Sequence, residues 1–402
     1  MIPPTAVDNQ TSGQHGTLLL FSNTVPTEES GSFVIFRRHL LPLVECGWQL
    51  KVFSYFPAPP GTIFWEHVLL PRRLPWWPPA SPFSILSQRC RAQLMIRHLK
   101  GKHFVDASGP LVLLTNLWDY QAIFAAELAR AGQAKLGVFI HDDEIIWNAG
   151  KQPAGYLNWR RRYVTDAASQ IWSVSNRLAE QIDFVSRQKC RLLRPIPGNY
   201  KCTPATWRPE FGQCLHLGYA GKIYPGLLTL LQNLASWLRQ AGGMLTVISD
   251  AESLAVSPAS ASDNISFRSY FARPDESLYW LAEHCSACIV AHPLTGTLPP
   301  GPWQALRTSF PSKLCEYAQT GLPLVLFGDS DSEFYEWSTQ HTKLPFFTDS
   351  RTEVCTSYLM SLKTQKGWSI AALETARIRD RYFNPENMQR DFLDDIHSLT
   401  AP

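Results

Sequence analysis

The chain has 402 residues, of which 45% are hydrophobic and 18% charged, enough apolar material for the cores of two ordinary domains. Its 37 basic and 34 acidic residues leave a net charge of +3, which argues against a general nucleic-acid binder. No apolar run approaches the roughly 18 residues that a membrane span needs.

The first 16 residues have neither the basic start nor the apolar stretch of a secretory signal, so we interpret 1–16 as a mobile polar tail. Nine cysteines are scattered without a framework, which favours reduced thiols in a cytoplasmic compartment. Cys285 and Cys288 form one C-x-x-C but lack a second pair at zinc spacing. We therefore expect them to be small buried residues.

In the first half, short β-rich apolar runs alternate with helical patterns. One helix is predicted at 120–132, where Phe124 and Leu128 share a side and a glycine ends the pattern. Strands are predicted at 17–23, 49–55, 110–116, 136–141 and 170–174.

A Pro-bearing connector then interrupts the alternation, and we place a linker at 197–213. The second half contains a strongly amphipathic helix at 226–243, with five leucines in helical register. Its strands are predicted at 214–221, 244–250, 265–271, 286–292 and 322–328. This alternation indicates an α/β protein with parallel sheets, in two halves that face each other across a cleft.

Three turns or helix starts after predicted strands are suited to phosphate. Gly31 and Ser32 follow the first strand, where a residue without a side chain lets the backbone approach an anion. Gly221 and Lys222 follow the first strand of the second half, at the edge where open α/β sheets bind ligands, although a plain exposed turn lysine is the alternative. The dinucleotide and P-loop glycine motifs are both absent from the sequence.

The third is a predicted helix that opens with Ser312 and Lys313 and carries Glu316 one turn later. A cation in the first turn opposes the helix dipole, and an anion bound at the helix start would explain it. The alternative is an i, i+3 ion pair between Lys313 and Glu316, worth about 0.2–0.5 kcal/mol.

The most conspicuous acidic cluster is His141, Asp142, Asp143 and Glu144, which lies at the carboxyl end of a predicted buried strand. His141 could act as an acid, a base or a polar contact in the cleft. The two aspartates could hold a divalent metal on a diphosphate. The third interpretation, which we favour for Asp143 and Glu144, is that they cap the next helix.

Basic and aromatic residues gather at 64–104, which holds seven lysines and arginines but one acidic residue, and again at 158–164. Basic residues attract anionic lipid and tryptophan suits the interface. These segments therefore suggest peripheral contact with an anionic membrane. A basic groove for a polyanionic acceptor and a plain solvated face are the alternatives.

Taken together, these features resemble the retaining, nucleotide-sugar-dependent glycosyltransferases of family 4, which have the GT-B fold. The most specific piece is PSKLCEYAQTGLPLVLF (311–327), which is similar to that family's P-x-K-x-x-E-Y-x-A-x-G-x-P-V segment. The glycine turn and helix from Ser30 are also similar, with Pro42 unusual inside the helix. Further matching segments are GVFIHDD, IWSVSNRLAEQI, GYAGKIY and the final ARIRDRYFNPENMQRDFLDDI.

The resemblance implies a fold of two Rossmann-like domains with parallel sheets. The domains would be an acceptor-side domain at 17–196 and a nucleotide-sugar-binding domain at 214–382. Residues 383–402 would form a C-terminal helix that crosses back to the first domain.

The resemblance also assigns the donor site. Glu316 would bind the ribose hydroxyls, and Lys313, with the backbone at Ser312 and Leu314, would meet the diphosphate. The diphosphate would then be stabilised by fixed cations and helix N-termini, without a metal or another cofactor.

Other residues take roles around the transferred sugar. Lys222, after Gly221, would neutralise the leaving phosphate, and Gly31 with Ser32 would close over it. His141 would face the sugar and the acceptor.

Two departures from the family pattern stand out. The first of the family's paired glutamates would fall at Thr308, so one acidic residue is missing. A second base after Lys222 is also missing, with Tyr224, Pro225 and Gly226 in that region.

We therefore expect a cytoplasmic glycosyltransferase that transfers a sugar from a nucleotide-diphosphate sugar to a glycan, glycolipid or other glycoconjugate, as in polysaccharide biosynthesis. One alternative is a GT-B-like subunit that has lost catalysis and binds a partner. A metal-dependent enzyme of the single-sheet GT-A type, using Asp142 and Asp143, and a nucleotide-sugar epimerase are further alternatives.

Overall fold

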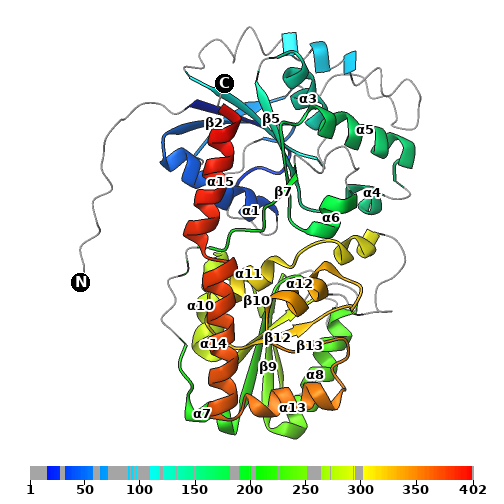
Figure 1. Cartoon of the computed structure of the whole chain (residues 1–402). Helices are drawn as coiled ribbons and strands as arrows, with labels where there is room; N and C mark the ends of the chain where they lie inside the picture. Colours follow the sequence, from blue (N-terminus) through cyan, green and yellow to red (C-terminus); the bar gives the residue numbers. More distant parts are fainter. Residues whose placement is uncertain are drawn as a thin grey trace, which may run out of the picture.

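The computed structural model describes residues 16–27, 32–57, 64–70, 89–90, 92–94, 96–97, 109–117, 121–132, 134–148, 151–181, 190–198, 200, 205–223, 226–250, 264–271, 273–292, 294 and 302–400. These residues form two sheets, one from each half of the sequence, and the strands within each pair in parallel. Figure 1 shows the two halves stacked on each other. The predicted pair of Rossmann-like α/β units is confirmed.

The first sheet has the strand order β3-β2-β1-β4-β5-β6-β7. Its central strands are almost entirely buried, as expected for parallel strands covered by helices on both faces. Its strands are β1 (Gly16–Phe21), β2 (Trp48–Ser54), β3 (Glu66–Leu69), β4 (Leu111–Asn116), β5 (Lys135–Ile140), β6 (Gln170–Ser173) and β7 (Cys190–Leu192).

Helices cover both faces of this sheet. One apolar cluster packs α1 and the C-terminal helix against side chains such as Leu18, Leu20 and Val112, whereas α3 and α5 contribute to the cluster on the other face. Pro42 lies inside α1, as expected from the sequence, and the helix continues beyond it to Glu45. The described helices of this half are α1 (Ser32–Glu45), α3 (Ala122–Arg130), α4 (Glu144–Trp147), α5 (Ala154–Ala167) and α6 (Asn176–Gln181).

The second sheet has the order β10-β9-β8-β11-β12-β13. Strands β11 and β12 are wholly buried and rich in apolar residues, which fits the interior of a parallel sheet. The strands are β8 (Leu215–Ala220), β9 (Gly243–Ser249), β10 (Ile265–Ser269), β11 (Ala287–Ala291), β12 (Leu324–Phe327) and β13 (Phe346–Phe347).

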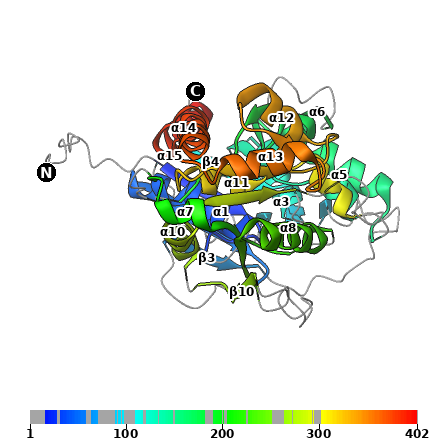
Figure 2. The same ribbon diagram turned by 90° about the horizontal axis from the view of Figure 1, so that it is seen from below.

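The helices of the second half lie on both sides of its sheet. Figure 2 shows α8 and α10 on one side and α11, α13 and α14 on the other. The predicted amphipathic helix is α8, in which the five leucines of the predicted register are buried and whose end is closed by Gly242 in the left-handed conformation. These helices are α7 (Pro209–Gln213), α8 (Leu227–Ala241), α10 (Pro274–His284), α11 (Ser312–Ala318), α12 (Glu333–His341), α13 (Glu353–Ser361) and α14 (Gln365–Tyr382), with a 3₁₀ helix, η2 (Pro302–Arg307).

The last helix, α15 (Pro385–Thr400), leaves the second half and packs on the first, as Figure 1 shows. Its Phe392 lies with its ring centroid 5.2 Å from that of Trp172 and 5.8 Å from that of Phe139. The Trp172 indole donates to the buried carboxylate of Asp395 at 2.8 Å. The chain therefore passes between the halves twice, near Ile196 and between α14 and α15, and the predicted crossing helix is confirmed.

Some local structure differs from the sequence-based expectation. The segment predicted as a linker contains α7, whose Phe211 is buried. Strands β3, β7 and β13 have only two to four residues, too few for a recognisable pattern. Cys285 and Cys288 are fully buried, as predicted, and the cysteines in the described part of the chain are free thiols.

Candidate functional site

Each sheet has a point where the strand order reverses, between β1 and β4 in the first half and between β8 and β11 in the second. Open α/β sheets bind ligands beyond the carboxyl ends of the strands at such points. In the first sheet Thr24 and Asn116 lie at this point, and His141 follows the neighbouring strand β5. In the second sheet Gly221 and His292 lie at this point.

Lys313 lies directly over the Gly221 turn. A Cβ added at Gly221 would collide with the Lys313 side chain, so the glycine makes room for the lysine. The Lys313 ammonium is 5.4 Å from the centre of the Tyr219 ring. Burial lowers the pKa of Lys313 to about 8, although the neighbouring Glu316 acts to raise it. Two separate sequence motifs thus meet at the reversal point of the second sheet.

His292 is a residue of this site that the sequence analysis missed. It follows β11, is buried, and its Nδ1 has no hydrogen-bond partner. Burial and the charge of Lys313 lower its pKa to about 3, so the imidazole is neutral at physiological pH. A histidine at the carboxyl end of a predicted buried strand, as at His141, was the signal that could have identified it.

Glu316 pairs with a residue from the other half of the molecule. One carboxylate oxygen accepts a bond from Arg38 of α1, while the other is buried without a hydrogen-bond partner. Arg38 also lies 3.5 Å from a carboxylate oxygen of Asp275 and from the carbonyl oxygen of Ile196. The main ion pair of Glu316 is therefore made across the two halves with Arg38, instead of locally with Lys313.

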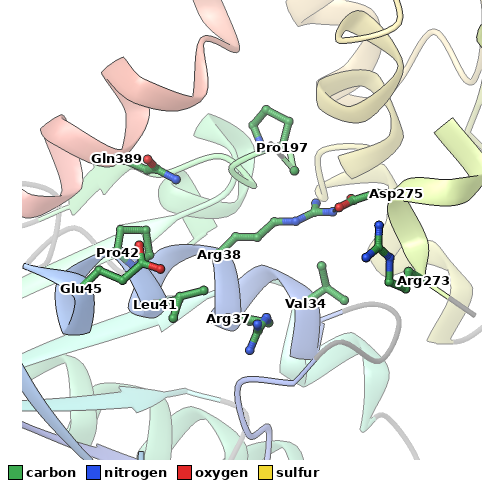
Figure 3. A pocket seen from close by; sticks show the side chains of 11 residues that line it. Val34, Arg37, Arg38, Leu41, Pro42, Glu45, Pro197, Arg273, Asp275 and Gln389 are labelled. Carbon is green, nitrogen blue, oxygen red and sulfur yellow. The ribbon is translucent and has the colours of Figure 1, made fainter. Parts of the chain in front are cut away.

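Arg38 borders a cavity of about 300 Å³ between α1, α10, the 197–198 segment and α15. In Figure 3 the Arg38 side chain extends from α1 toward Asp275, with Arg273 and Arg37 nearby. A Cβ at Gly198 would come within 2.6 Å of the Asp275 carboxylate. Gly198 therefore lets the ion pair of Arg38 with Asp275 lie against the 197–198 segment that connects the halves.

The other predicted donor-site residues are placed as follows. Ser312 begins α11 and is half-buried, but the backbone N–H of Leu314 already donates to the Pro311 carbonyl at 3.0 Å. The Lys222 side chain is exposed, and its carbonyl accepts from the Tyr219 hydroxyl at 2.9 Å. Gly31 lies outside the described residues, as does the side chain of Ser32.

On the first sheet, His141 borders a second cavity, of about 340 Å³, with Thr24, Asn116, Asp142 and Trp147. The His141 ring lies against those of Phe36 and Phe139. Its Nδ1 is buried without a hydrogen-bond partner. Burial, reinforced by nearby His39, lowers the pKa of His141 to about 3.

Two residues of the acidic cluster, Asp143 and Glu144, contribute to the local structure at the start of α4. Asp143 is the N-cap of α4, accepting from the backbone N–H groups of Ile145 and Ile146 at 3.0 and 3.2 Å. Arg161 lies 2.9 Å from both Asp143 and Glu144. The capping interpretation is thus confirmed for Asp143, and no cluster of metal-ligating side chains occurs within the described ranges.

Asp142 differs from its neighbours because it faces the cavity instead of the helix start. Burial raises its pKa to about 6, with the Trp147 hydrogen bond acting to lower it and the Asp143 charge to raise it.

Thr308 stands where the family pattern has a glutamate, and it belongs to the contact between the halves. Its hydroxyl donates to the Ala305 carbonyl at 2.9 Å, and its carbonyl accepts from the buried Ser175 hydroxyl. Beside this contact, Glu333 accepts from the backbone N–H groups of Asn176 and Arg177 at 3.3 and 3.1 Å.

The basic run at 158–164 lies on α5 and is less exposed than predicted. Arg160 and Arg161 are buried, and Arg161 is bound to the acidic cluster; Arg162 is exposed. Most of 64–104 lies outside the described residues. Among the helices that the structure describes, we find none with the length and apolar character to cross a membrane.

The two sheets, the reversal points and the crossing helix define the GT-B fold. Similar solved structures agree. A glycosyltransferase from Rickettsia africae ESF-5 has 14% identity and a TM-score of 0.61, with 96% of this chain and 99% of that chain covered. WaaG, a glycosyltransferase involved in lipopolysaccharide biosynthesis, has 14% identity and a TM-score of 0.55, with 94% and 99% covered.

A third similar structure is an E. coli trehalose-6-phosphate protein bound with UDP-2-fluoro glucose. It has 10% identity and a TM-score of 0.61, with 96% of this chain and 99% of that chain covered. Neither a family model nor a curated protein sequence matches the chain. At these identities the similarity establishes the fold.

Proposed function

We propose that this protein is a glycosyltransferase that moves a sugar from a nucleotide-diphosphate sugar to a hydroxyl group of an acceptor. The observation that carries the proposal is the meeting of Lys313 with Gly221 at the reversal point of the second sheet, with Glu316 one turn further along α11. A half-buried cation over a glycine turn is suited to a diphosphate, and a carboxylate one helical turn further along is suited to ribose hydroxyls.

In this proposal the acceptor oxygen replaces the diphosphate at the anomeric carbon, and the acceptor proton leaves with the diphosphate. Lys313 stabilises the negative charge that develops on the leaving group. Lys222 at the same turn, with Gly31 and Ser32 from the first half, would surround the phosphates. His141 is neutral and would offer a hydrogen bond near the transferred sugar.

We further propose that the reaction retains the anomeric configuration, needs no metal and belongs to the family 4 type. The metal-free part is supported by the engagement of Asp143 and Glu144 with Arg161. The single-sheet GT-A alternative is wrong, because the chain forms two sheets. Analysis of the product anomer by NMR and activity in EDTA test the other two points.

The acceptor and the setting are also proposals. A glycan or glycolipid acceptor in polysaccharide assembly remains our expectation, as does peripheral contact with an anionic membrane. The burial of Arg160 and Arg161 leaves Arg162 as the exposed arginine of its run. Membrane contact would therefore depend mainly on 64–104.

The donor site can be tested by a thermal-shift screen of the full chain against UDP, GDP, ADP, CDP and dTDP and their common sugar conjugates, in EDTA. A ligand at a hundredfold excess over its Kd stabilises the folded state by about 2.7 kcal/mol. We expect one nucleotide class to raise the Tm and Glu316→Ala to abolish the effect. Glu353→Ala, at an exposed position of α13, is the matched control and should behave as wild type.

No response to any nucleotide, in EDTA or with magnesium restored, would favour the alternative of a subunit without catalysis. The replacement of an acidic residue by Thr308, which contacts Ser175, is the observation behind that alternative. Nucleotide release that does not depend on any acceptor would instead favour an epimerase.

A further inference from the structure

The cavity beside His141 differs chemically from the donor side. It lies beyond the carboxyl ends of β1, β4 and β5, where Thr24, Asn116 and Asp142 contribute a hydroxyl, an amide and a carboxyl group. Trp147 adds an indole from α4. Its volume of about 340 Å³ falls within the range of about 300–1,000 Å³ that small-molecule sites occupy.

The side chains around this cavity suit an uncharged ligand with several hydroxyl groups. Hydroxyl, amide and carboxylate oxygens all accept hydrogen bonds from sugar hydroxyls, and the first two groups also donate. The Trp147 indole offers a flat apolar surface for the C–H face of a sugar ring, while its N–H is hydrogen-bonded to Asp142. None of the lining residues that the structure describes is lysine or arginine.

The charge of the cavity disfavours an anion. Asp142, with a pKa of about 6, is ionised at neutral pH, and His141, with a pKa of about 3, contributes no positive charge. A phosphate placed here would meet a carboxylate without a compensating cation among the described lining residues. The cavity beside Arg38 differs in that it does contain cations, since Arg37, Arg38 and Arg273 line it together with the acidic Glu45 and Asp275.

We infer that the acceptor is an uncharged sugar residue that binds in this cavity, with one hydroxyl on Asp142 and its ring against Trp147. This inference rests on the proposed function, because it treats the occupant of the cavity as the acceptor. Asp142 then selects the acceptor, and a site built to receive a hydroxyl rejects a phosphate in its place.

The test measures binding in the full chain by saturation-transfer NMR, so that it does not depend on turnover. The probes are the methyl glycosides of glucose, galactose, mannose and N-acetylglucosamine, each paired with its 6-phosphate. We expect at least one neutral glycoside to bind at least tenfold more tightly than its phosphate. Asp142→Asn should weaken the neutral glycoside and reduce that preference to below threefold, and Trp147→Phe should weaken both members of the pair.

Asp394→Asn, at an exposed position of α15, is the matched control and should leave both affinities unchanged. The Tm of each variant checks that it is folded. No binding by any neutral glycoside, equal or tighter binding of a 6-phosphate, or a preference unaffected by Asp142→Asn would each overturn the inference. Failure of the proposed function gives a different result, which is the absence of any nucleotide-dependent Tm shift.

Discussion

At the scale of single residues, the site depends on which charges are buried and what lies beside them. Lys313 was predicted because a cation opens a helix, and the structure explains how it is accommodated, since Gly221 leaves space for its side chain. His292 was not predicted, because its position at the end of a strand does not by itself reveal its closeness to Lys313, 21 positions further along the chain. Local sequence patterns do not encode such a pair.

The pKa of Lys313 gives a pH prediction. Burial lowers this pKa to about 8, and the ammonium form is the one that attracts a diphosphate. Nucleotide affinity should therefore change by less than about twofold from pH 6.5 to 7.5 and fall as the pH rises above about 8, approaching tenfold per pH unit. Titration calorimetry with the nucleotide found in the screen measures this dependence.

Lys313→Met keeps most of the side-chain volume without the charge, so it should bind the nucleotide weakly at every pH in this range. If the variant lost affinity above pH 8 as steeply as wild type, the titrating group would be another residue.

At the scale of elements, the sequence patterns identified the strands and helices with strong periodicity, such as α8 and the central strands of both sheets. They missed β13, since two residues carry no period. The relation of α11 to α1 was also beyond local reasoning, because Arg38 and Glu316 are 278 positions apart. Resemblance to a known fold supplied the crossing helix, which periodicity alone would not have placed on the first half.

The packing of α15 predicts a stability effect. Phe392 is buried among aromatic rings, including those of Trp172 and Phe139. Phe392→Ala should lower the free energy of unfolding by about 3–5 kcal/mol, through lost burial and the cavity left behind. Asp391→Ala, at the neighbouring exposed position, should change it by less than about 0.5 kcal/mol. Chemical denaturation monitored by circular dichroism compares the two, and equal losses would contradict the assigned packing.

At the scale of the whole molecule, the contacts between the halves include two sets of ion pairs, each centred on an arginine. One is Arg38 with Glu316 and Asp275. The other is Arg177, which lies 2.8 Å from Asp331 and 2.5 Å from Glu336. Only the first involves a residue of the proposed donor site, so the two sets should differ in their effect on nucleotide binding.

Arg38→Ala should free Glu316 for the ribose and tighten nucleotide binding by about tenfold, which corresponds to about 1.4 kcal/mol. Arg177→Ala removes a comparable contact between the halves without touching Glu316, and it should leave the affinity within about twofold of wild type. Titration calorimetry measures the nucleotide Kd of both variants and so tests whether Arg38 competes with the nucleotide for Glu316. Unchanged or weaker binding in Arg38→Ala would mean that Arg38 does not compete with the nucleotide.

The two passages of the chain between the halves also constrain how the molecule can open. Both passages lie on the same side of the molecule, and α6 lies on the opposite side (Figure 1). Two covalent connections on one side define a hinge axis. If one half rotates about this axis relative to the other, each atom moves in proportion to its distance from the axis. Arg38, within 3.5 Å of the Ile196 carbonyl, has a short lever arm, and Arg177 on α6 has a long one. A small rotation would therefore separate Arg177 from its partners while Arg38 stays within reach of Glu316.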